Sequence, residues 1–390
     1  MKILVIQPWI RAGGAETLTI HLAYNLQNLG HRVTIITLFV DFIGIPSIYK
    51  SLRFITPFRY ISKLCKQKLF FRWFFGFWLL LYLGFREGKT ADLLNPHNFP
   101  THWIASIVSL IFRKPVVWTC NEPPTKVLWR EARKIGLQEF FGSVISTSFV
   151  DKILVKKVKY IIVLDRKNQI RIKTRYGRKS IIIHSGVDFN FYSCNKIEEN
   201  VFEKYDLENR FILLTVGRLT LQKNQLMCIK CLRIVLDRIK EAFLIIVGSG
   251  PMEGELKQLA RELNIDSYIK FTGLISNEEL RALYYICDIN LFPAIKQSWG
   301  LTPFEALCAK KISIISNDCG AAEILSKEGF GVVCEPTPEK FAENVIRIYN
   351  NQDYYRNIAQ KGFEYVKENI SWQQYAKKVS SVFLKSVKKI

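Results

Sequence analysis

Short apolar runs rich in Val, Ile and Leu recur along the chain, and a longer helical pattern follows most of them. Such uninterrupted runs are typical of strands buried on both faces, in parallel sheets that helices cover. Their alternation with helices predicts repeated βαβ units. The expected strands are Lys2–Ile6, Arg32–Phe39, Asp92–Asn95, Val116–Thr119, Tyr160–Leu164 and Ser180–His184 in the first half, and Phe211–Gly217, Ala242–Gly248, Ile269–Gly273, Ile286–Phe292, Ile312–Ser316 and Gly331–Cys334 in the second.

Two such sets of strands predict an α/β protein with two doubly wound, Rossmann-like parallel sheets. The length of 390 residues agrees with two or three domains at about 150 residues each. The polar stretch Asp188–Arg210 lacks periodicity and is the expected hinge. We therefore expect a first domain over residues 1–188 and a second over 189–371. The amphipathic last helix, within 372–390, is expected to pack back on the first domain.

Positive charge is concentrated in the first half of the chain. The whole chain has a net charge of +22, and residues 1–190 hold 29 basic and 10 acidic residues. Residues 191–390 hold 27 basic and 24 acidic residues. The excess indicates an anionic partner, which is nucleic acid, anionic lipid or a phosphorylated ligand. Nucleic acid is not expected, because no nucleic-acid-binding signature is present and the aromatic residues cluster in one apolar run.

That apolar run lies in residues 50–89, which contain nine basic residues, one acidic residue and twelve aromatic residues. Its uninterrupted part, Trp73–Phe85, ends at Arg72 and Arg86 and is shorter than the 20 or so residues that span a bilayer. Basic charge beside Trp and Phe favours a helix or loop that lies in the headgroup layer of an anionic membrane. The alternative is a buried helix of the first domain with solvated basic neighbours.

The cysteines and the N-terminus indicate a reducing, cytosolic compartment. The nine cysteines are odd in number and irregular in spacing, so no disulfide framework is expected. Cys228 and Cys231 are interpreted as two apolar positions of a helix. The chain enters its first strand at Lys2 without a leader sequence, and no signal peptide is expected.

Two glycine-containing turns follow expected strands. Gly13 and Gly14 precede an apolar helical run, and the free N–H groups at the start of such a helix favour a phosphate. Gly217 and Arg218 end the first strand of the second half, with Lys223 five residues later. An Arg and a Lys at this place can clamp a diphosphate. Taken alone, each pattern also fits an ordinary turn or solvated surface cations.

A third signal is the stretch from Pro293 to Cys308. It holds Gln297, Gly300 and Leu301, and Glu305 lies at the start of an apolar helix. A carboxylate at a helix start often accepts hydrogen bonds from the first N–H groups of that helix. It can equally accept hydrogen bonds from sugar or ribose hydroxyls.

Together these pieces resemble the family-4 retaining glycosyltransferases of the GT-B fold. The resemblance covers nearly the whole chain and is strongest over residues 211–345. The motifs that carry it are Gly13-Gly14, His97 in Asn95-Pro96-His97-Asn98, Gly186-Val187-Asp188, Gly217-Arg218 with Lys223, Gly248-Ser249-Gly250-Pro251, Gly300-Leu301 leading to Glu305, and Gly320-Ala321-Ala322-Glu323. The resemblance implies that the two Rossmann-like domains face a central cleft.

The resemblance also implies roles for these positions. Arg218 and Lys223 would neutralise the diphosphate leaving group, Glu305 would hold the ribose hydroxyls, and His97 would face the donor sugar and the acceptor. The N–H of Gly14 would join the clamp when the domains close. No metal or other cofactor is expected, because cations and a helix dipole replace it. The implied donor-binding positions are Gly13, Gly14, Gly217, Arg218, Lys223, Gly248, Gly250, Gln297, Gly300, Leu301 and Glu305.

Two positions depart from the family pattern. Gln297 stands where the family usually has the first of two glutamates, so the amide keeps an acceptor oxygen and loses the charge. Asn121 stands where relatives often have a histidine, and Glu122 beside it could supply a carboxylate on the acceptor side. His21, His31, His102 and His184 are interpreted as structural or surface histidines.

The expected function is retaining transfer of a hexosyl unit from a UDP- or GDP-type nucleotide sugar to a membrane-associated acceptor. A polyprenyl-linked glycan or a glycolipid matches the basic, aromatic first domain, as in polysaccharide biosynthesis. The protein is expected to be cytoplasmic and peripheral on the inner face of the membrane. One alternative is a catalytically silent GT-B subunit that binds a partner or the membrane. Another is a nucleotide-sugar epimerase of the same fold.

Overall fold

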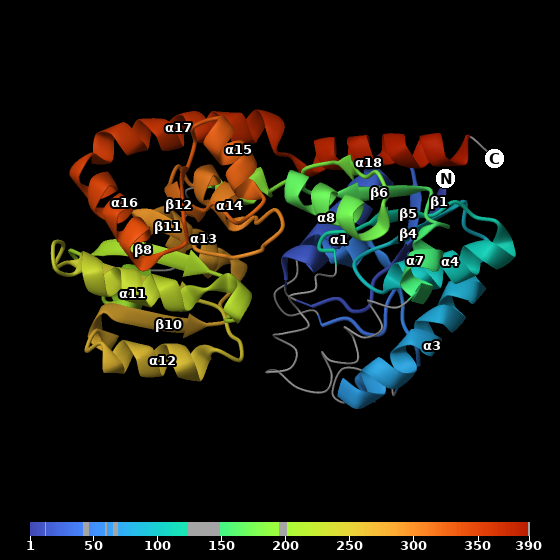
Figure 1. Cartoon of the computed structure of the whole chain (residues 1–390), viewed down its shortest axis with the longest axis horizontal. Coiled ribbons are helices and arrows are strands. Elements are labelled where there is room, and N and C mark those ends of the chain that lie inside the picture. Colours follow the sequence, from blue (N-terminus) through green and yellow to red (C-terminus); the bar gives the residue numbers. More distant parts are fainter. Residues whose placement is uncertain are drawn as a thin grey trace. The chain divides into compact units, whose positions relative to one another are not determined.

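The computed structural model describes residues 1–11, 13–41, 47–58, 61–64, 69–123, 149–194 and 201–388. The chain divides into two compact units (Figure 1). Unit 1 comprises Met1–Gly186 together with Trp372–Ile390, and unit 2 comprises Val187–Ser371. Each unit has its own parallel sheet.

The sheet of unit 1 is parallel in every described pair of neighbouring strands. Its first part has the order β3-β2-β1-β4 and its second part the order β5-β6-β7. Two parallel bridges, Leu94 to Val116 and His97 to Thr119, join β4 to β5. The strands are β1 (Lys2–Ile6), β2 (Arg32–Ile36), β3 (Arg53–Ile55), β4 (Leu93–Pro96), β5 (Val117–Thr119), β6 (Tyr160–Val163) and β7 (Ile181–Ile182).

Helices cover the sheet of unit 1. One core cluster joins the sheet to α3 and α4 through residues such as Leu4, Leu80 and Ile104. The C-terminal helix α18 packs on α1, where the rings of Trp372 and His21 stack with centroids 4.6 Å apart. The helices are α1 (Gly14–Asn28), η1 (Ser47–Ser51), α3 (Leu69–Gly88), α4 (Thr101–Phe112), α7 (Phe149–Val155), α8 (Arg166–Tyr176) and α18 (Trp372–Val387).

Unit 2 contains a six-stranded parallel sheet in the order β10-β9-β8-β11-β12-β13. Its four inner strands are almost fully buried, and β9, for example, is buried at every residue, whereas the edge strands β10 and β13 are only partly buried. This agrees with the apolar runs that predicted a sheet covered on both faces. The strands are β8 (Phe211–Val216), β9 (Ala242–Val247), β10 (Ile269–Gly273), β11 (Ile289–Phe292), β12 (Ile312–Ser316) and β13 (Val332–Cys334).

The helices of unit 2 follow its strands along the chain. Core clusters lie on both faces of the sheet, one with α11 and α16 and the other with α13. The helices are α9 (Phe189–Tyr192), α10 (Val201–Tyr205), η2 (Leu221–Lys223), α11 (Gln225–Val235), α12 (Glu253–Glu262), η3 (Asp266–Tyr268), α13 (Asn277–Ile286), α14 (Thr302–Cys308), α15 (Ala321–Lys327), α16 (Pro338–Asn350) and α17 (Gln352–Asn369).

The sequence prediction was wrong at several element boundaries. Strand β3 was missed, because Arg53–Ile55 has only three residues in a basic and aromatic stretch. The strand expected at Ile286–Phe292 begins at Ile289, since α13 continues to Ile286. The described residues of the stretch 188–210, expected to be the hinge, belong to unit 2 and follow directly after the boundary between the units at Gly186 and Val187. There the Asp188 side chain accepts a hydrogen bond from the N–H of Phe191 and caps α9.

None of the described helices combines the length and apolar character needed to cross a bilayer. The aromatic run lies in α3, which has 20 residues. Figure 1 shows α3 as a long helix at the edge of unit 1.

Candidate active site

The strand order of unit 2 reverses between β8 and β11. From β8 the chain proceeds to β9 on one side, whereas β11, β12 and β13 lie on the other side. Ligands of open α/β sheets bind beyond the carboxyl ends of the strands at such a reversal. The predicted donor residues Gly217 and Arg218 directly follow β8, and Pro293 directly follows β11.

Two glycine loops lie against each other at this edge. A Cβ added to Gly248 would lie 2.1 Å from the carbonyl oxygen of Gly217, and Gly248 has a φ of +126°. A Cβ on Gly250 would lie 2.3 Å from the carbonyl oxygen of Leu219. The N–H of Leu219 donates to the carbonyl of Ser249 at 3.0 Å. Only glycine therefore permits this close approach of the β8 and β9 loops.

Lys223, in the loop after β8, contacts Phe292, the last residue of β11. Its Nζ lies 5.7 Å from the ring centroid of Phe292, within the range of a cation–π interaction. A Cβ on Gly300 would lie 2.7 Å from Cζ of the same ring, and the φ of Gly300 is +88°. Arg218 is exposed and Lys223 is half-buried. A Cβ on Gly217 would lie 3.6 Å from Cδ of Lys223, so Lys223 lies between Gly217 and the Phe292 ring, which Gly300 also contacts.

Glu305 lies on α14 and is held by two tyrosines. Tyr284 Oη donates to Glu305 Oε2 at 2.7 Å, and Tyr192 also hydrogen-bonds the carboxylate. Burial raises the pKa of Glu305 to about 7, although both tyrosines and the positive charge of Lys223 lower it. Tyr192 on α9 and Tyr284 on α13 could not be predicted as partners of Glu305, because neither belongs to a recognisable motif and both lie outside the stretch around Glu305.

Several buried polar atoms at this edge have no partner among the described residues. They are Gln297 Oε1, Thr302 Oγ1 and Gln225 Oε1. Gln297 belongs to a loop that is tied to the start of α15, since its carbonyl accepts from the N–H of Gly320 at 3.2 Å. Leu301 is the N-cap residue of α14, next to Thr302. Unpaired buried polar atoms are costly, so they fit a place where a polar ligand binds.

Gly13 and Gly14 lie at the start of α1 in unit 1, after β1. Gly13 is the N-cap residue with extended backbone, and Gly14 is the first helical residue. A Cβ on Gly13 would lie 2.6 Å from Oε2 of Glu16. The glycine therefore leaves room for the Glu16 carboxylate to approach the first turn of α1. The roles of Gly13 and Gly14 in binding a donor stay predictions.

His97 follows β4 and is fully buried in unit 1. Its Nε2 lies 2.8 Å from Asn95 Oδ1, and its Nδ1 lies 2.9 Å from Thr19 Oγ1. The Asn95 amide donates to Val117 and Thr119, which directs its oxygen toward the ring. Burial lowers the pKa of His97 to about 3, so the ring is neutral. His97 then donates through Nε2 and accepts through Nδ1, and its role in the reaction stays a prediction.

The two predicted acceptor-side residues follow β5. Asn121 is 4% exposed, and neither atom of its side-chain amide has a hydrogen-bond partner among the described residues. Its backbone carbonyl accepts a hydrogen bond from Asn168 Nδ2 at 3.0 Å. Glu122 is exposed. Their acceptor-side roles also stay predictions.

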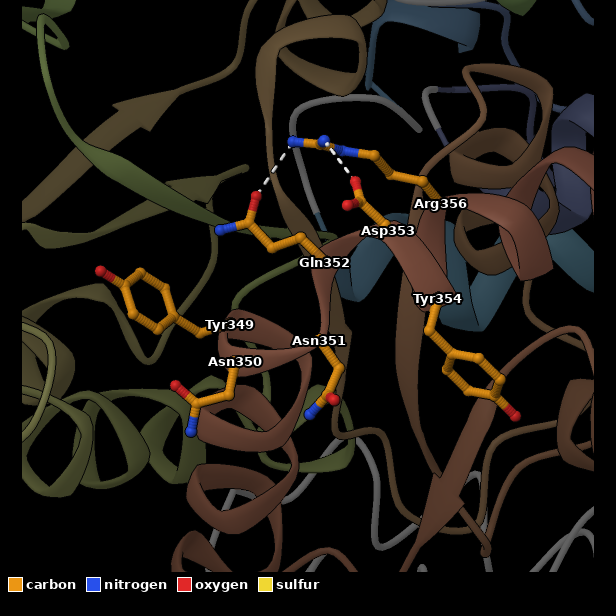
Figure 2. A pocket seen from close by; sticks show the side chains of 7 residues that line it. All are labelled: Tyr349, Asn350, Asn351, Gln352, Asp353, Tyr354 and Arg356. Carbon is orange, nitrogen blue, oxygen red and sulfur yellow. Dashed lines mark hydrogen bonds and ion pairs between the residues drawn. The ribbon is translucent and has the colours of Figure 1, made fainter.

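A surface hollow of about 510 Å³ lies at the junction of α16 and α17 (Figure 2). Its residues interact with one another, as Arg356 does with Asp353 and Gln352. Tyr349 at its rim bonds Glu241, which precedes β9. The hollow therefore lies at the amino edge of the sheet, opposite the edge where ligands bind in this architecture.

The described residues contain no group of three or more His, Cys, Asp or Glu side chains that could hold a metal ion. Cys228 and Cys231 lie buried on α11, as apolar positions of the helix. Burial raises the pKa of Cys228 to about 12 and also raises the pKa of Cys231, so both remain thiols.

Two family models match successive parts of the chain. The model for Glycosyltransferase Family 4 matches residues 12–191, and the model for Glycosyl transferases group 1 matches residues 197–365. The chain is a family-4 glycosyltransferase. The resemblance drawn from the motifs is thereby confirmed.

Named relatives and solved structures agree with this assignment. An uncharacterized glycosyltransferase of Methanocaldococcus jannaschii is 24% identical over 93% of this chain and 92% of that protein. A GDP-mannose-dependent phosphatidylinositol dimannoside mannosyltransferase of Mycobacterium tuberculosis is 26% identical over 45% of each chain. HepE of Anabaena, in complex with UDP-glucose, superimposes with a TM-score of 0.77 at 16% identity, covering 99% of this chain and 100% of that chain. The structural likeness confirms the GT-B fold.

Proposed function

We propose that this glycosyltransferase moves a hexosyl unit from a UDP- or GDP-type sugar to a membrane-associated acceptor, with retention and without a metal. The observation that carries the proposal is the arrangement of Arg218, Lys223 and Glu305 at the carboxyl edge of unit 2. The cations suit a diphosphate leaving group, and the carboxylate suits the hydroxyls of a ribose. Retention rests on the family resemblance.

The relatives support both the nucleotide-sugar donor and the membrane-associated acceptor that we propose. HepE is described with UDP-glucose, and the mycobacterial mannosyltransferase is described as GDP-mannose-dependent. The name of the latter includes phosphatidylinositol dimannoside, a glycolipid. A polyprenyl-linked glycan or a glycolipid is therefore the acceptor class that we propose, and assembly of a surface polysaccharide is its setting.

Unit 1 has an exposed apolar surface that suits such an acceptor. Phe75, Trp78 and Tyr82 of α3 are 42%, 64% and 62% exposed. Helix α4 packs against α3 and against α7, and both α4 and α7 add exposed apolar residues. We call this set the apolar surface of unit 1; its residues are Phe75, Trp78, Tyr82, Leu110, Ile111, Phe149, Val150 and Ile153.

Exposed basic residues lie on or directly after the same three helices. They are Arg86, Lys89, Arg113, Lys152 and Lys156. Exposed apolar and basic residues on the same helices fit the headgroup layer of an anionic membrane. We propose that residues 50–89, together with the adjoining parts of α4 and α7, hold the enzyme on the inner face of the cell membrane.

Replacing Trp78 with Ala is expected to weaken binding to phosphatidylglycerol vesicles by about tenfold, because the indole loses its apolar burial in the lipid. Binding is measured by cosedimentation. Tyr354→Ala in unit 2 is the matched control, since Tyr354 is also 64% exposed. Added NaCl should weaken the binding. Equal binding of the Trp78 and Tyr354 variants would contradict the proposed docking.

The proposed reaction is tested by donor consumption. The purified protein is incubated with UDP- and GDP-sugars in EDTA, with and without a lipid extract, and mass spectrometry follows the donors and the released nucleotide. We expect one donor to disappear, faster with lipid. No consumption by folded protein would favour a catalytically silent subunit. Activity that appears only in Gln297→Glu would assign that silence to the missing carboxylate.

A further inference from the structure

The surface hollow at the junction of α16 and α17 lies outside the proposed active site. Its lining runs from Tyr349, near the end of α16, to Arg356 on α17 (Figure 2). Glu241, which bonds Tyr349, precedes β9, whereas Gly248 follows this strand. The six residues of β9 span about 20 Å, so the hollow and the glycine loops lie at opposite ends of the strand. A ligand in the hollow therefore leaves the carboxyl edge of the sheet free.

Two tyrosine rings form part of the lining. The volume of about 510 Å³ falls within the roughly 300–1,000 Å³ that is usual for small-molecule sites. Tyr349 and Tyr354 lie on either side of residues 350–351 (Figure 2). Tyr354 is 64% exposed, and the ring of Tyr349 is held perpendicular to that of Phe211, with centroids 5.0 Å apart. The tyrosines thus supply apolar ring surface together with hydroxyl groups.

Arg356 holds two polar side chains beside each other in the hollow. Its Nη1 donates to Asp353 Oδ1 at 3.1 Å, and its Nη2 donates to Gln352 Oε1 at 2.9 Å (Figure 2). Among the described residues, Gln352 Nε2 and Asp353 Oδ2 have no hydrogen-bond partner. The amide therefore offers donors beside an acceptor of the carboxylate, which suits neighbouring hydroxyls. The charges of Asp353 and Arg356 cancel, and this favours a neutral ligand over a phosphorylated one.

We propose that this hollow binds a neutral oligosaccharide, at a site separate from the active site. A sugar ring has apolar C–H faces and a rim of hydroxyls, and the hollow offers tyrosine rings next to donors and acceptors without net charge. The hollow is open to solvent, so a longer chain can extend beyond it. A glycan held there raises the effective concentration of glycan chains at the enzyme. This binding goes beyond the proposed reaction and does not require it.

Binding of maltotriose, mannotriose and galactotriose to the full chain, without nucleotide, tests the site. Saturation-transfer NMR titrations give the dissociation constants. We expect at least one trisaccharide to bind, and Tyr354→Ala to weaken this binding about tenfold, because the sugar loses an aromatic surface. Gln352→Met keeps the side-chain length and removes the amide, and it should weaken binding about fivefold. Inorganic phosphate should not compete.

Phe202→Ala is the matched control, because Phe202 is an exposed aromatic residue of the same unit, on α10. It should bind the trisaccharide as the unaltered protein does. All three substitutions are at the surface, so each variant should keep its Tm within about 2 °C.

Three results would overturn the proposal. They are no binding of any trisaccharide, competition by inorganic phosphate, and binding by Tyr354→Ala that is as tight as that of the unaltered protein. The last result would place the bound sugar elsewhere on the molecule. Failure of donor consumption would instead count against the proposed function, since trisaccharide binding is measured without a donor.

Discussion

Lys223→Ala is expected to lower turnover by about two to three orders of magnitude, because the proposed diphosphate leaving group would lose a positive charge close to it. Lys223 is held by the loop after β8, and its Nζ lies 5.7 Å from the Phe292 ring centroid. Its position is therefore set before a ligand arrives. Initial rates of nucleoside diphosphate release measure the effect.

The same variant is expected to shift the pH profile. The positive charge of Lys223 lowers the pKa of Glu305. Without it, Glu305 should take up its proton at a higher pH, so the acid limb of the profile moves upward. Lys223→Arg keeps the charge and should recover part of both effects.

Lys230→Ala is the matched control, because Lys230 is an exposed cation of the same unit on α11. It should retain the activity and the pH profile of the unaltered enzyme. If Lys223→Ala and Lys230→Ala have comparable activity, Lys223 does not bind the diphosphate.

Much of the fold could be predicted because both sheets are parallel and covered by helices. Their buried strands are apolar without interruption, as in Phe211–Val216 and Ala242–Val247, and this pattern is visible in the sequence. Strand β3 was not visible, because its three residues begin with Arg53 and lie in a basic and aromatic stretch rather than in an apolar run. The junction of α13 with β11 was also misplaced, because helix and strand are both apolar there.

The close approach of the loops after β8 and β9 could be predicted from their glycines. The positions of Gly248 and Gly250 follow from contacts that no other residue allows. The partners of Glu305 could not be predicted, because Tyr192 and Tyr284 reach it only through the tertiary packing of α9, α13 and α14. The hydrogen bonds that hold His97 could not be predicted either, because one of them is made with Thr19, which lies 78 residues away in the sequence.

Glu305→Gln is expected to lower kcat/KM by about two orders of magnitude above pH 8, because an amide replaces the carboxylate that we propose accepts hydrogen bonds from substrate hydroxyls. The pKa of Glu305 is about 7. The unaltered enzyme should therefore lose activity as the pH falls through 7 and the carboxylate takes up a proton. The variant should not show this titration. Rates between pH 5.5 and 9 measure both effects.

The free energy of unfolding of Glu305→Gln should rise at alkaline pH, although the activity of this variant falls. The folded pKa of Glu305 lies above its ordinary value of 4.5, so the folded state holds the proton more tightly than the unfolded chain. The stabilising contribution of Glu305 is therefore full below pH 4.5 and is lost as the pH rises through 7. At pH 8 the free energy of unfolding of Glu305→Gln should exceed that of the unaltered enzyme by about 2 kcal/mol.

Glu339→Gln on α16 is the control, because Glu339 is exposed and should change neither activity nor its pH dependence. A structural role for Glu305 predicts that Glu305→Gln lowers both stability and activity. A catalytic-site carboxylate predicts that activity falls while stability at pH 8 rises, since Tyr192 and Tyr284 can still donate to the amide oxygen. The two measurements together decide between these roles, and unchanged activity in Glu305→Gln would remove Glu305 from the donor site.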